Sequence, residues 1–324
     1  MSEITGFFLH PSSPLHDTGW GHPEHQGRLR ALASSVGNDL LTLHGHVEQM
    51  EAGDGTEHDL LLVHTEEHVR QVRTACQRAE DKNSIIAIDS DTKVSSESWN
   101  AALGSVGTAI TATRAVARGE IRNAFVATRP PGHHATPDQA MGFCLFNNIA
   151  VTARWLQAEG YADRILIIDW DVHHGNGTHE AFYTDPTVYF LSLHQSPHYP
   201  GTGSVNERGS DDGEGYTLNV PLPSATPRVD YLEAFDRALE KTLKDFSPEF
   251  VLVSAGFDVM AQDPLGGMLL EPQDLYVMTR RIVEGTAADC NGKVVALLEG
   301  GYNPPRVGQG VVAVIRGLAG LEQP

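Results

Sequence analysis

Two carboxylates, two imidazoles and two glycines lie close together between Asp169 and Gly177. Four consecutive apolar residues, 165–168, precede them, which is typical of a strand buried on both faces in a parallel sheet. Asp171 and His173 are two residues apart, so on an extended backbone their side chains leave the same side. A carboxylate and an imidazole held on a stiff strand form half of a divalent-metal site. We therefore predict a metal site here, the simpler alternative being a polar strand end with solvated charges.

Three further polar clusters follow predicted strands at their carboxyl ends. They are His133-His134 after 123–127, Asp258 after 250–254 and Tyr302 after 293–298. Taken singly, each has a simpler explanation, such as a helix N-cap for Asp258. Parallel strands end along one edge of their sheet, where ligands bind, so residues more than a hundred apart in sequence can converge there. We expect all four clusters to form one site.

The residue types in these clusters predict metal-assisted hydrolysis. Asp171, His173 and Asp258 can supply three ligands and leave a fourth position open for water or substrate. An ion held in this way lowers the pKa of bound water and polarises a carbonyl oxygen. His133 and His134 can act as general base and general acid, and the sequence leaves open which of them carries each proton transfer. Zinc is the expected metal, although two carboxylates and one imidazole would also accept Fe(II).

Two further residues have predicted roles beside the metal. Asp169 lies two residues before Asp171 and can orient one of the two imidazoles. Tyr302 can donate its hydroxyl to an oxyanion, and Gly300 and Gly301 before it permit close backbone approach. The chain contains no Gly-x-Ser-x-Gly elbow, so a serine hydrolase has no support.

Strands and helices alternate along the chain. We predict strands at 5–9, 85–88, 123–127, 165–168, 187–193, 216–220, 250–254 and 293–298, and helices at 24–36, 66–79, 96–118, 146–159, 229–246, 271–288 and 307–321. This alternation predicts a mostly parallel sheet with helices on both faces. The proline-containing stretch 221–227 is expected to end the strand before it. No linker, repeat or low-complexity segment divides the chain, so we expect a single domain over residues 1–324.

Composition limits the kinds of partner. The 324 residues include 23 basic and 42 acidic ones, a formal net charge of −19. Such a balance argues against nucleic-acid binding, which needs a basic surface. It suits cationic substrates such as lysine side chains or polyamines, and equally well simple solubility.

The chain also carries signals of its compartment. Its three cysteines are odd in number and far apart, as expected for a reducing compartment such as the cytoplasm. The N-terminus has no signal-peptide pattern, and no apolar run approaches the roughly 20 residues of a membrane span. We therefore expect no membrane partner, while the oligomeric state stays open.

Eight motifs along the chain, in order, resemble those of the histone deacetylase family, closest to its class II and bacterial deacetylase-like branch. They lie at 21–29, 129–135, 142–148, 169–177, 200–203, 254–258, 263–267 and 298–302. The resemblance implies the arginase-like three-layer α/β fold, with one zinc ion per chain. It also implies hydrolysis, through a metal-activated water, of the amide of acetyl-lysine in a peptide or protein, or of a related acylated amine.

The resemblance also implies roles for individual residues. It makes Asp171, His173 and Asp258 the zinc ligands, His134 the preferred general base and acid beside His133, and Tyr302 the catalytic tyrosine. Asn176 stands where class I members have Asp, so it implies a neutral amide partner for His134. The implied acyl-lysine tunnel has five wall residues: Gly142, Phe143, Tyr199, Leu265 and Gly300. The implied inner potassium site uses Asp169, Asp171, His173, Ser192 and Leu193, and the outer one Phe182, Asp185, Val188 and Tyr216.

Three alternatives are weighed. In polyamine-specific relatives a Glu stands where this chain has Leu265, so we expect acyl-lysine to be preferred over acetylpolyamines, although Asp89 and Asp91 on a predicted rim loop offer other carboxylates. A catalytically weak module that binds acyl-lysine is a second alternative, and the complete set of candidate residues argues against it. A binuclear manganese ureohydrolase of the same fold would need an Asp-Ala-His-x-Asp run, which the sequence lacks.

Overall fold

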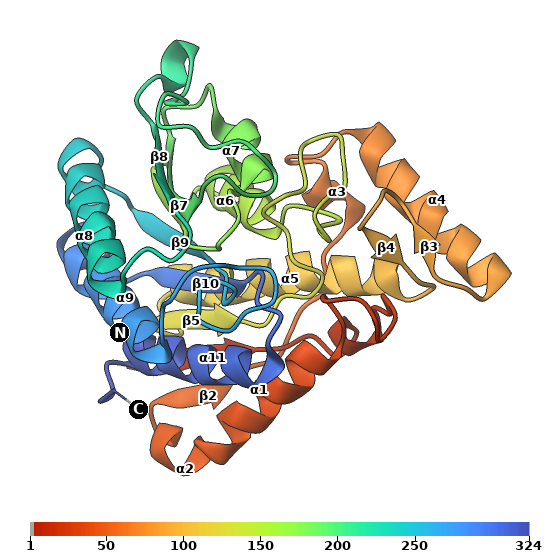
Figure 1. Ribbon diagram of the computed structural model, residues 1–324, viewed down its shortest axis with the longest axis horizontal. Helices are drawn as coiled ribbons and strands as arrows, with labels where there is room; N and C mark the ends of the chain where they lie inside the picture. The colour runs from red at the N-terminus through yellow and green to blue at the C-terminus, as the bar shows by residue number, and fades with distance from the viewer. Residues whose placement is uncertain (1–2, 324) are drawn as a thin grey trace.

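The computed structural model describes residues 3–323. Its centre is an eight-stranded sheet in the order β2-β1-β5-β10-β9-β6-β7-β8 (Figure 1). The strands are β1 (Thr5–Phe8), β2 (Val47–Gln49), β5 (Asn123–Val126), β6 (Ile165–Asp169), β7 (Val188–Gln195), β8 (Thr217–Leu222), β9 (Phe250–Ala255) and β10 (Val294–Leu298). Every neighbouring pair in this sheet is parallel. The predicted α/β fold with a parallel sheet is confirmed.

Helices cover both faces of the sheet. One face carries α1 (Gly27–Asn38), α8 (Arg228–Asp245), α9 (Pro272–Gly285) and α11 (Pro304–Ala319). The other carries α4 (Glu66–Lys82), α5 (Ser98–Ala117) and α6 (Asn148–Ala158). Shorter helices are α2 (Leu40–Leu43), α3 (Glu57–Leu60), α7 (Asn176–Phe182) and α10 (Ala287–Cys290). The molecule therefore has three layers.

The apolar run of β6 explains how the layers are joined. Leu166 and Ile168 pack into the core on the α8–α9–α11 side, whereas Ile165 and Ile167 pack into the core on the α5–α6 side. Because successive side chains of a strand point to opposite faces, a strand buried on both faces needs an unbroken apolar run. All four side chains are fully buried.

Three local features differ from the prediction. Strand β8 continues through Pro221, which the sequence suggested would end it, because β8 is an edge strand and a proline there need not donate to a ladder. The short edge strand β2 was not predicted. The strand predicted at 85–88 lies outside the main sheet, where β3 (Ile86–Ala87) pairs antiparallel with β4 (Lys93–Val94).

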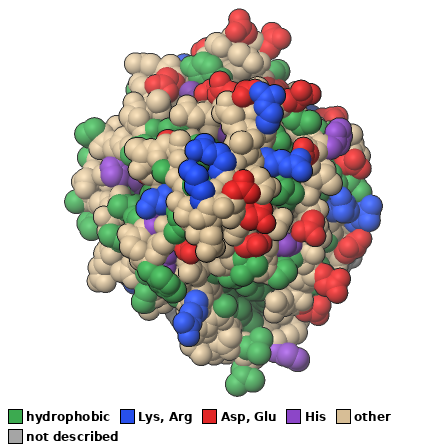
Figure 2. Space-filling model, turned by 90° about the vertical axis from the view of Figure 1, so that its right-hand side faces the viewer, with side chains coloured by type: hydrophobic (Ala, Val, Ile, Leu, Met, Phe, Trp, Pro, Cys, Tyr) green, Lys and Arg blue, Asp and Glu red, His purple; other side chains and the backbone are tan. Residues whose placement is uncertain are grey.

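The surface carries charges of both signs. Figure 2 shows the molecule from the right-hand side of Figure 1. On this face acidic and basic side chains are interspersed, with apolar ones between them. Among residues 3–323, no helix is both long and apolar enough to cross a bilayer.

Candidate active site

The predicted clusters meet because their four strands are neighbours. The centre of the sheet has the order β5-β10-β9-β6. His133 and His134 follow β5, Tyr302 follows β10, Asp258 follows β9, and Asp171 and His173 follow β6. Parallel strands place all these segments at one edge of the sheet.

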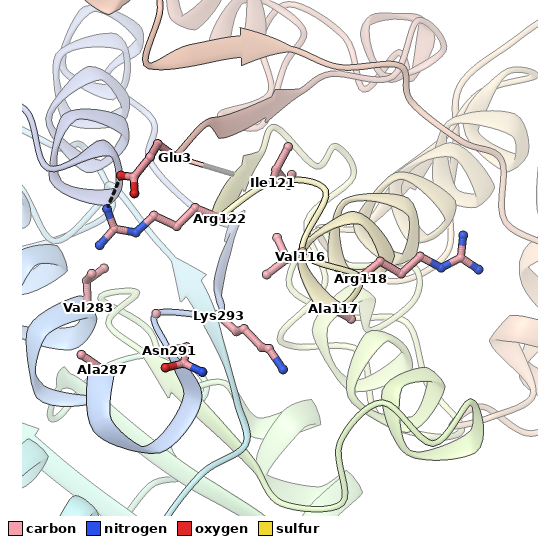
Figure 3. A pocket seen from close by; sticks show the side chains of 12 residues that line it. Glu3, Val116, Ala117, Arg118, Ile121, Arg122, Val283, Ala287, Asn291 and Lys293 are labelled. Atoms are coloured by element: carbon pink, nitrogen blue, oxygen red, sulfur yellow. Dashed lines mark ion pairs between the residues drawn. The ribbon is translucent and has the colours of Figure 1, made fainter. Parts of the chain in front are cut away.

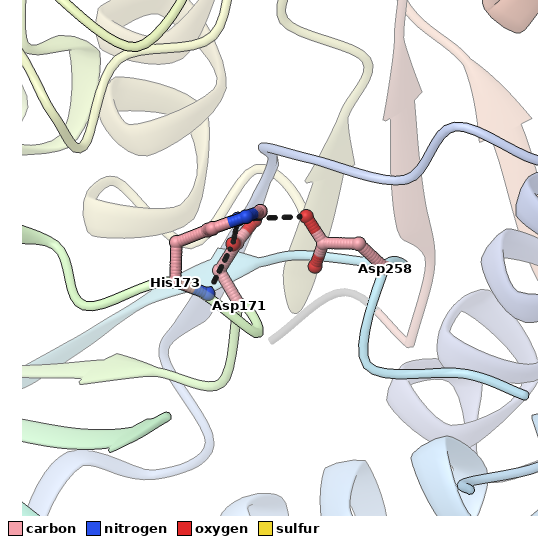
Figure 4. Close-up of side chains that lie close together, drawn as sticks. All are labelled: Asp171, His173 and Asp258. Atoms are coloured by element: carbon pink, nitrogen blue, oxygen red, sulfur yellow. Dashed lines mark hydrogen bonds and ion pairs between the residues drawn. The ribbon is translucent and has the colours of Figure 1, made fainter. Parts of the chain in front are cut away.

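Asp171, His173 and Asp258 form a buried cradle of ligand atoms (Figure 4). One atom from each side chain lies within 4.8 Å of the others. His173 Nδ1 is 3.0 Å from Asp171 Oδ1 and 3.3 Å from Asp258 Oδ2. Backbone N–H groups hold the carboxylates from outside: Gly300 N donates to Asp171 Oδ2 at 2.8 Å, and Val172 N to Asp258 Oδ1 at 3.0 Å.

Two observations show that this cradle fits a divalent cation. Asp258 Oδ2 is fully buried yet accepts no hydrogen bond within the described part of the chain. A Cβ atom at Gly300 would lie only 2.0 Å from that oxygen and 2.7 Å from Asp171 Oδ2, so only glycine leaves these carboxylates room. A donor set of two carboxylates and one imidazole is one that zinc or Fe(II) accepts.

The pKa values of Asp258 and His173 also agree with a cation site. Burial and the nearby Asp171 raise the pKa of Asp258 to about 7. Burial alone would lower the pKa of His173, but its hydrogen bond with Asp171 and the nearby Asp258 carboxylate raise it to about 10. Protons and a divalent cation would therefore compete for these three groups.

The two histidines after β5 lie in different environments. His133 Nδ1 donates to Asp169 Oδ2 at 3.0 Å. Although burial alone would lower the pKa of His133, the carboxylates of Asp171 and Asp169 raise it to about 10. These two carboxylates therefore favour the protonated form of His133.

His134 has an amide partner instead. Its Nδ1 donates to Asn176 Oδ1 at 2.8 Å, while Asn176 Nδ2 donates back to the His134 carbonyl at 3.3 Å. Burial and the neighbouring cation on His133 hold the pKa of His134 well below its usual value. His134 is thus neutral, with the proton on Nδ1 and a lone pair on Nε2 that can accept a proton.

Tyr302 is held through its backbone. Its N–H donates to Asp263 Oδ2 at 2.6 Å. The Arg28 guanidinium lies 5.2 Å from the centre of its ring. Burial and Asp258 raise the pKa of Tyr302 well above its usual value, so the phenol keeps its proton. Within residues 3–323 the hydroxyl has no hydrogen-bond partner and is free to donate.

A cavity of about 210 Å³ leads to these side chains. Its walls are Asp91, His134, Gly142, Phe143, His173, His198, Tyr199, Leu265 and Tyr302. Four of the five predicted tunnel residues therefore line it. The fifth, Gly300, lies behind the cradle against Asp171 and Asp258, where its Cβ-free backbone gives the carboxylates room.

A tight turn places one wall of this tunnel. Gly142 and Phe143 both have positive φ, +55° and +69°, and Met141 and Cys144 pair across them. A Cβ atom at Gly142 would lie 2.4 Å from the His134 ring, so the turn packs directly on that histidine. Phe143 thereby stands edge-on to Tyr302, with ring centres 5.7 Å apart.

The opposite wall contains a residue without a predicted role. His198 follows β7, and its ring stacks on His173 with centres 4.8 Å apart. Its Nε2 donates to the Leu265 carbonyl at 2.8 Å, so His198 connects the loop that carries Leu265 to the ring of His173. The sequence offered one signal for His198, its position next to Tyr199.

The residues of the implied potassium sites lie on β6, β7 and the adjoining loops. Asp169 and Ser192 are register partners, and Asp169, Asp171, His173, Ser192 and Leu193 are all buried. In the outer set, Phe182 and Tyr216 carbonyls already accept backbone N–H groups from Asp185 and Phe190. The Asp185 carboxylate binds Arg154, whose guanidinium also lies 4.6 Å from the Phe182 ring centre. Val188 begins β7.

A cavity of about 520 Å³ lies elsewhere, near the amino ends of β5 and β10 (Figure 3). Its lining includes Arg122, which pairs with Glu3, and Lys293. None of the predicted site residues lines it. It therefore plays no part in the chemistry described above.

A buried ionic network, which the sequence did not reveal, supports the segment before Tyr302. Arg28 donates to the carbonyls of Gly301 at 2.6 Å and Glu299 at 2.5 Å. Glu24 accepts from Arg28 at 3.0 Å and from Arg129 at 2.7 Å. The only sign of this network in the sequence was that Glu24, Arg28 and Arg129 belong to the motifs at 21–29 and 129–135.

Comparisons with known proteins point to one family. The family model described as histone deacetylase domain matches residues 22–318. An Archaeoglobus fulgidus protein named "Probable deacetylase" is 38% identical over 327 residues, covering 99% of this chain and 89% of its own. "Histone deacetylase 10, chloroplastic" of Oryza sativa subsp. japonica is 38% identical over 309 residues, covering 92% and 70%.

A solved structure gives the same result for the fold. The crystal structure of the HDA15 HD domain superposes with a TM-score of 0.91 at 38% identity, covering 99% of this chain and 89% of that one. The fold is therefore that of the arginase and deacetylase class of α/β proteins. Within that class, the chain belongs to the histone deacetylase family of hydrolases.

Proposed function

We propose that this protein is a zinc-dependent deacylase that hydrolyses the amide of acetyl-lysine, with residues 1–324 as one catalytic domain. The observation that carries the proposal is the buried cradle of Asp171, His173 and Asp258 at the inner end of a narrow tunnel. His134 and Tyr302 also line that tunnel, so a proton acceptor and a hydroxyl donor face the same space. Relatives named deacetylases support the reaction class.

The metal would be held by Asp171, His173 and Asp258. When bound, it polarises the substrate carbonyl and lowers the pKa of water. His134 accepts a proton from the attacking water at Nε2, because Asn176 fixes its tautomer, and then returns a proton to the leaving amine. His133 stays cationic beside Asp169, and Tyr302 donates its hydroxyl to the oxygen on which negative charge develops.

Leu265 supports the choice of acyl-lysine over acylated polyamines as the proposed substrate. Leu265 lines the tunnel and cannot pair with the second ammonium of a polyamine. Asp91 also lines it and is the feature that favours the alternative, an acetylpolyamine amidohydrolase. Asp91 already accepts two hydrogen bonds within the protein. Its carbonyl accepts from His22 Nε2 at 2.9 Å, and its carboxylate accepts from the Thr92 hydroxyl at 3.0 Å.

Two further parts of the proposal concern ions and compartment. We assign structural potassium to the inner set around Asp169 and Ser192 and to the outer set around Asp185 and Tyr216. The first rests on the shared burial of its members at the ends of β6 and β7. A reducing compartment such as the cytoplasm suits three cysteines that are free and buried.

A substrate panel tests the proposed function. Purified protein loaded with zinc is assayed with acyl-lysine peptides of increasing acyl length and with acetylated polyamines. We expect measurable turnover of the acetyl-lysine peptide and a higher kcat/KM for it than for N8-acetylspermidine. Binding of the peptide without any turnover would instead support a binding module.

A further inference from the structure

The loop that carries the two histidines rests on one buried carboxylate. Glu299 is fully buried at the end of β10. Its Oε2 accepts hydrogen bonds from the backbone N–H groups of Gly132 at 2.7 Å and His133 at 3.2 Å. Its Oε1 accepts from the Ser254 hydroxyl on β9 at 3.1 Å. One side chain thus connects the ends of three of the four central strands.

The residues after Glu299 hold the remaining parts of the site. Gly300 N donates to the ligand Asp171, the Gly301 carbonyl accepts from Arg28, and Tyr302 N donates to Asp263. The segment 299–302 therefore fixes the histidine loop, a ligand of the cradle and the tyrosine relative to one another. Of these contacts, only the one to the histidine loop is made by a side chain of the segment.

From this geometry we propose that Glu299 is a positioning residue for the reaction, setting the place of His133 and His134 by binding two consecutive N–H groups through Oε2. The proposal rests on the proposed deacylase function. Its physical basis is that a displacement of about 1 Å in a catalytic group can cost on the order of 100-fold in rate. In a variant whose side chain does not reach the loop, the N–H groups of Gly132 and His133 would also be buried without an acceptor.

The proposed role depends on the reach of the side chain and not on its charge. Burial raises the pKa of Glu299 to about 7, so near neutral pH the ionised and neutral forms coexist. In the neutral form Oε2 remains a carbonyl acceptor, while the protonated Oε1 donates to the Ser254 hydroxyl. A glutamine has the same reach and can present its amide oxygen in the same place, whereas an aspartate is shorter by one C–C bond, about 1.5 Å.

Two conservative variants separate reach from charge. With zinc-loaded protein and an acetyl-lysine peptide, we expect Glu299→Gln to keep kcat within about 10-fold of the parent. We expect Glu299→Asp to lose on the order of 100-fold in kcat, with KM within about 3-fold and zinc content unchanged. An aspartate variant as active as the parent, or a glutamine variant as impaired as the aspartate one, would overturn the proposal.

Glu249 supplies a matched control. Its Oε2 accepts from two consecutive N–H groups, those of Asp163 and Arg164, at 2.7 and 3.1 Å, before the amino end of β9 and away from the site. We expect Glu249→Asp and Glu249→Gln to leave kcat unchanged, which would exclude a general effect of loosening such a contact.

A second measurement does not depend on turnover. Amide hydrogen exchange over residues 129–136 should accelerate in Glu299→Asp and stay close to the parent in Glu299→Gln. Equal protection in both variants would contradict the proposal even if the parent showed no deacylase activity. A parent without turnover, but with this exchange pattern, would instead count against the proposed function alone.

Discussion

Asn176 Oδ1 lies 2.8 Å from His134 Nδ1, whereas the adjacent His133 has the carboxylate of Asp169 at 3.0 Å. Two neighbouring imidazoles therefore have partners of different charge. The carboxylate favours the protonated ring of His133, whereas burial and the charge on His133 lower the pKa of His134, which has only a neutral amide as partner. This difference supports the proposal that His134, which the family resemblance also prefers, carries the proton transfers.

Changing the partner of His134 should shift its titration. In Asn176→Asp a carboxylate beside Nδ1 stabilises the imidazolium, so the pKa of His134 rises. The acidic limb of the pH profile of kcat/KM should move to higher pH, because His134 must be neutral to accept a proton. A pH profile with an unmoved acidic limb would show that His134 is not the base.

Loss of a cradle carboxylate should remove the metal. Asp171→Ala or Asp258→Ala leaves two ligands, so we expect both variants to lose zinc on dialysis and to lose all activity. Metal content measured by atomic emission checks this, with Asp236→Ala as control, since that half-buried carboxylate on α8 pairs with Arg281 away from the site. Stoichiometric zinc in both variants would refute the ligand assignment.

Removal of the tyrosine hydroxyl should affect the chemical step alone. Tyr302→Phe keeps the ring between Phe143 and Arg28, and we expect it to retain fold and zinc while kcat falls on the order of 100-fold or more. Tyr276→Phe, which loses a hydroxyl on α9 that donates to the Leu321 carbonyl beyond the end of α11, is the matched control. Turnover of Tyr302→Phe within a few-fold of the parent would make Tyr302 a packing residue.

A carboxylate at the tunnel wall should change substrate choice. In Leu265→Glu the cavity lining gains a negative charge, which would pair with the second ammonium of a bound polyamine. We expect the ratio of kcat/KM for N8-acetylspermidine to that for an acetyl-lysine peptide to rise at least tenfold. Leu269→Glu introduces the same charge at an exposed position outside the tunnel lining. If both variants leave the ratio unchanged, Leu265 does not face substrate.

The buried network of Glu24 should contribute stability that acid removes. Burial alone would raise the pKa of Glu24, but Arg129 and Arg28 lower it to about 2 from an ordinary value of 4.5. A carboxylate with a depressed pKa stabilises the fold above about pH 4.5, and this stability is lost as the pH falls toward 2. Glu24→Gln should cost about 3 kcal/mol of unfolding free energy at pH 7, because Arg28 and Arg129 stay buried.

Urea unfolding of parent and variant at pH 7 and at pH 4 measures that difference. The gap between the two proteins should narrow at the lower pH. Glu67→Gln, which removes an exposed ion pair with Arg70, should cost far less. A gap that stays constant with pH would show that the charge of Glu24 is not what stabilises the network.

The sequence predicted the fold well because its strands are buried on both faces. The run 165–168 is apolar at every position, and such runs mark the central strands directly. The convergence of Asp171, Asp258, His133 and Tyr302 then followed from the rule that parallel strands end at one edge. Strand β2 was missed because its three residues, Val47 to Gln49, are partly exposed and mixed in character.

Other parts of the site depend on contacts that no local pattern records. Glu299 acts on a loop 166 residues away in the chain, through backbone N–H groups that have no sequence signature. His198 faces the tunnel because the chain turns after β7 and its ring stacks on His173. The continuation of β8 through Pro221 depended on which strands lie at the edge, and the order of strands cannot be read from their composition.

The walls and the floor of the tunnel come from different kinds of structure. Asp91, Phe143, Tyr199 and Leu265 lie on loops, whereas Asp171, Asp258 and Glu299 lie at or just beyond the ends of central strands. Mutation and insertion in those loops can therefore change which acylated molecule enters while the hydrolytic groups stay in place. A scaffold divided in this way lets natural selection, or a protein engineer, alter substrate preference and turnover as separate traits.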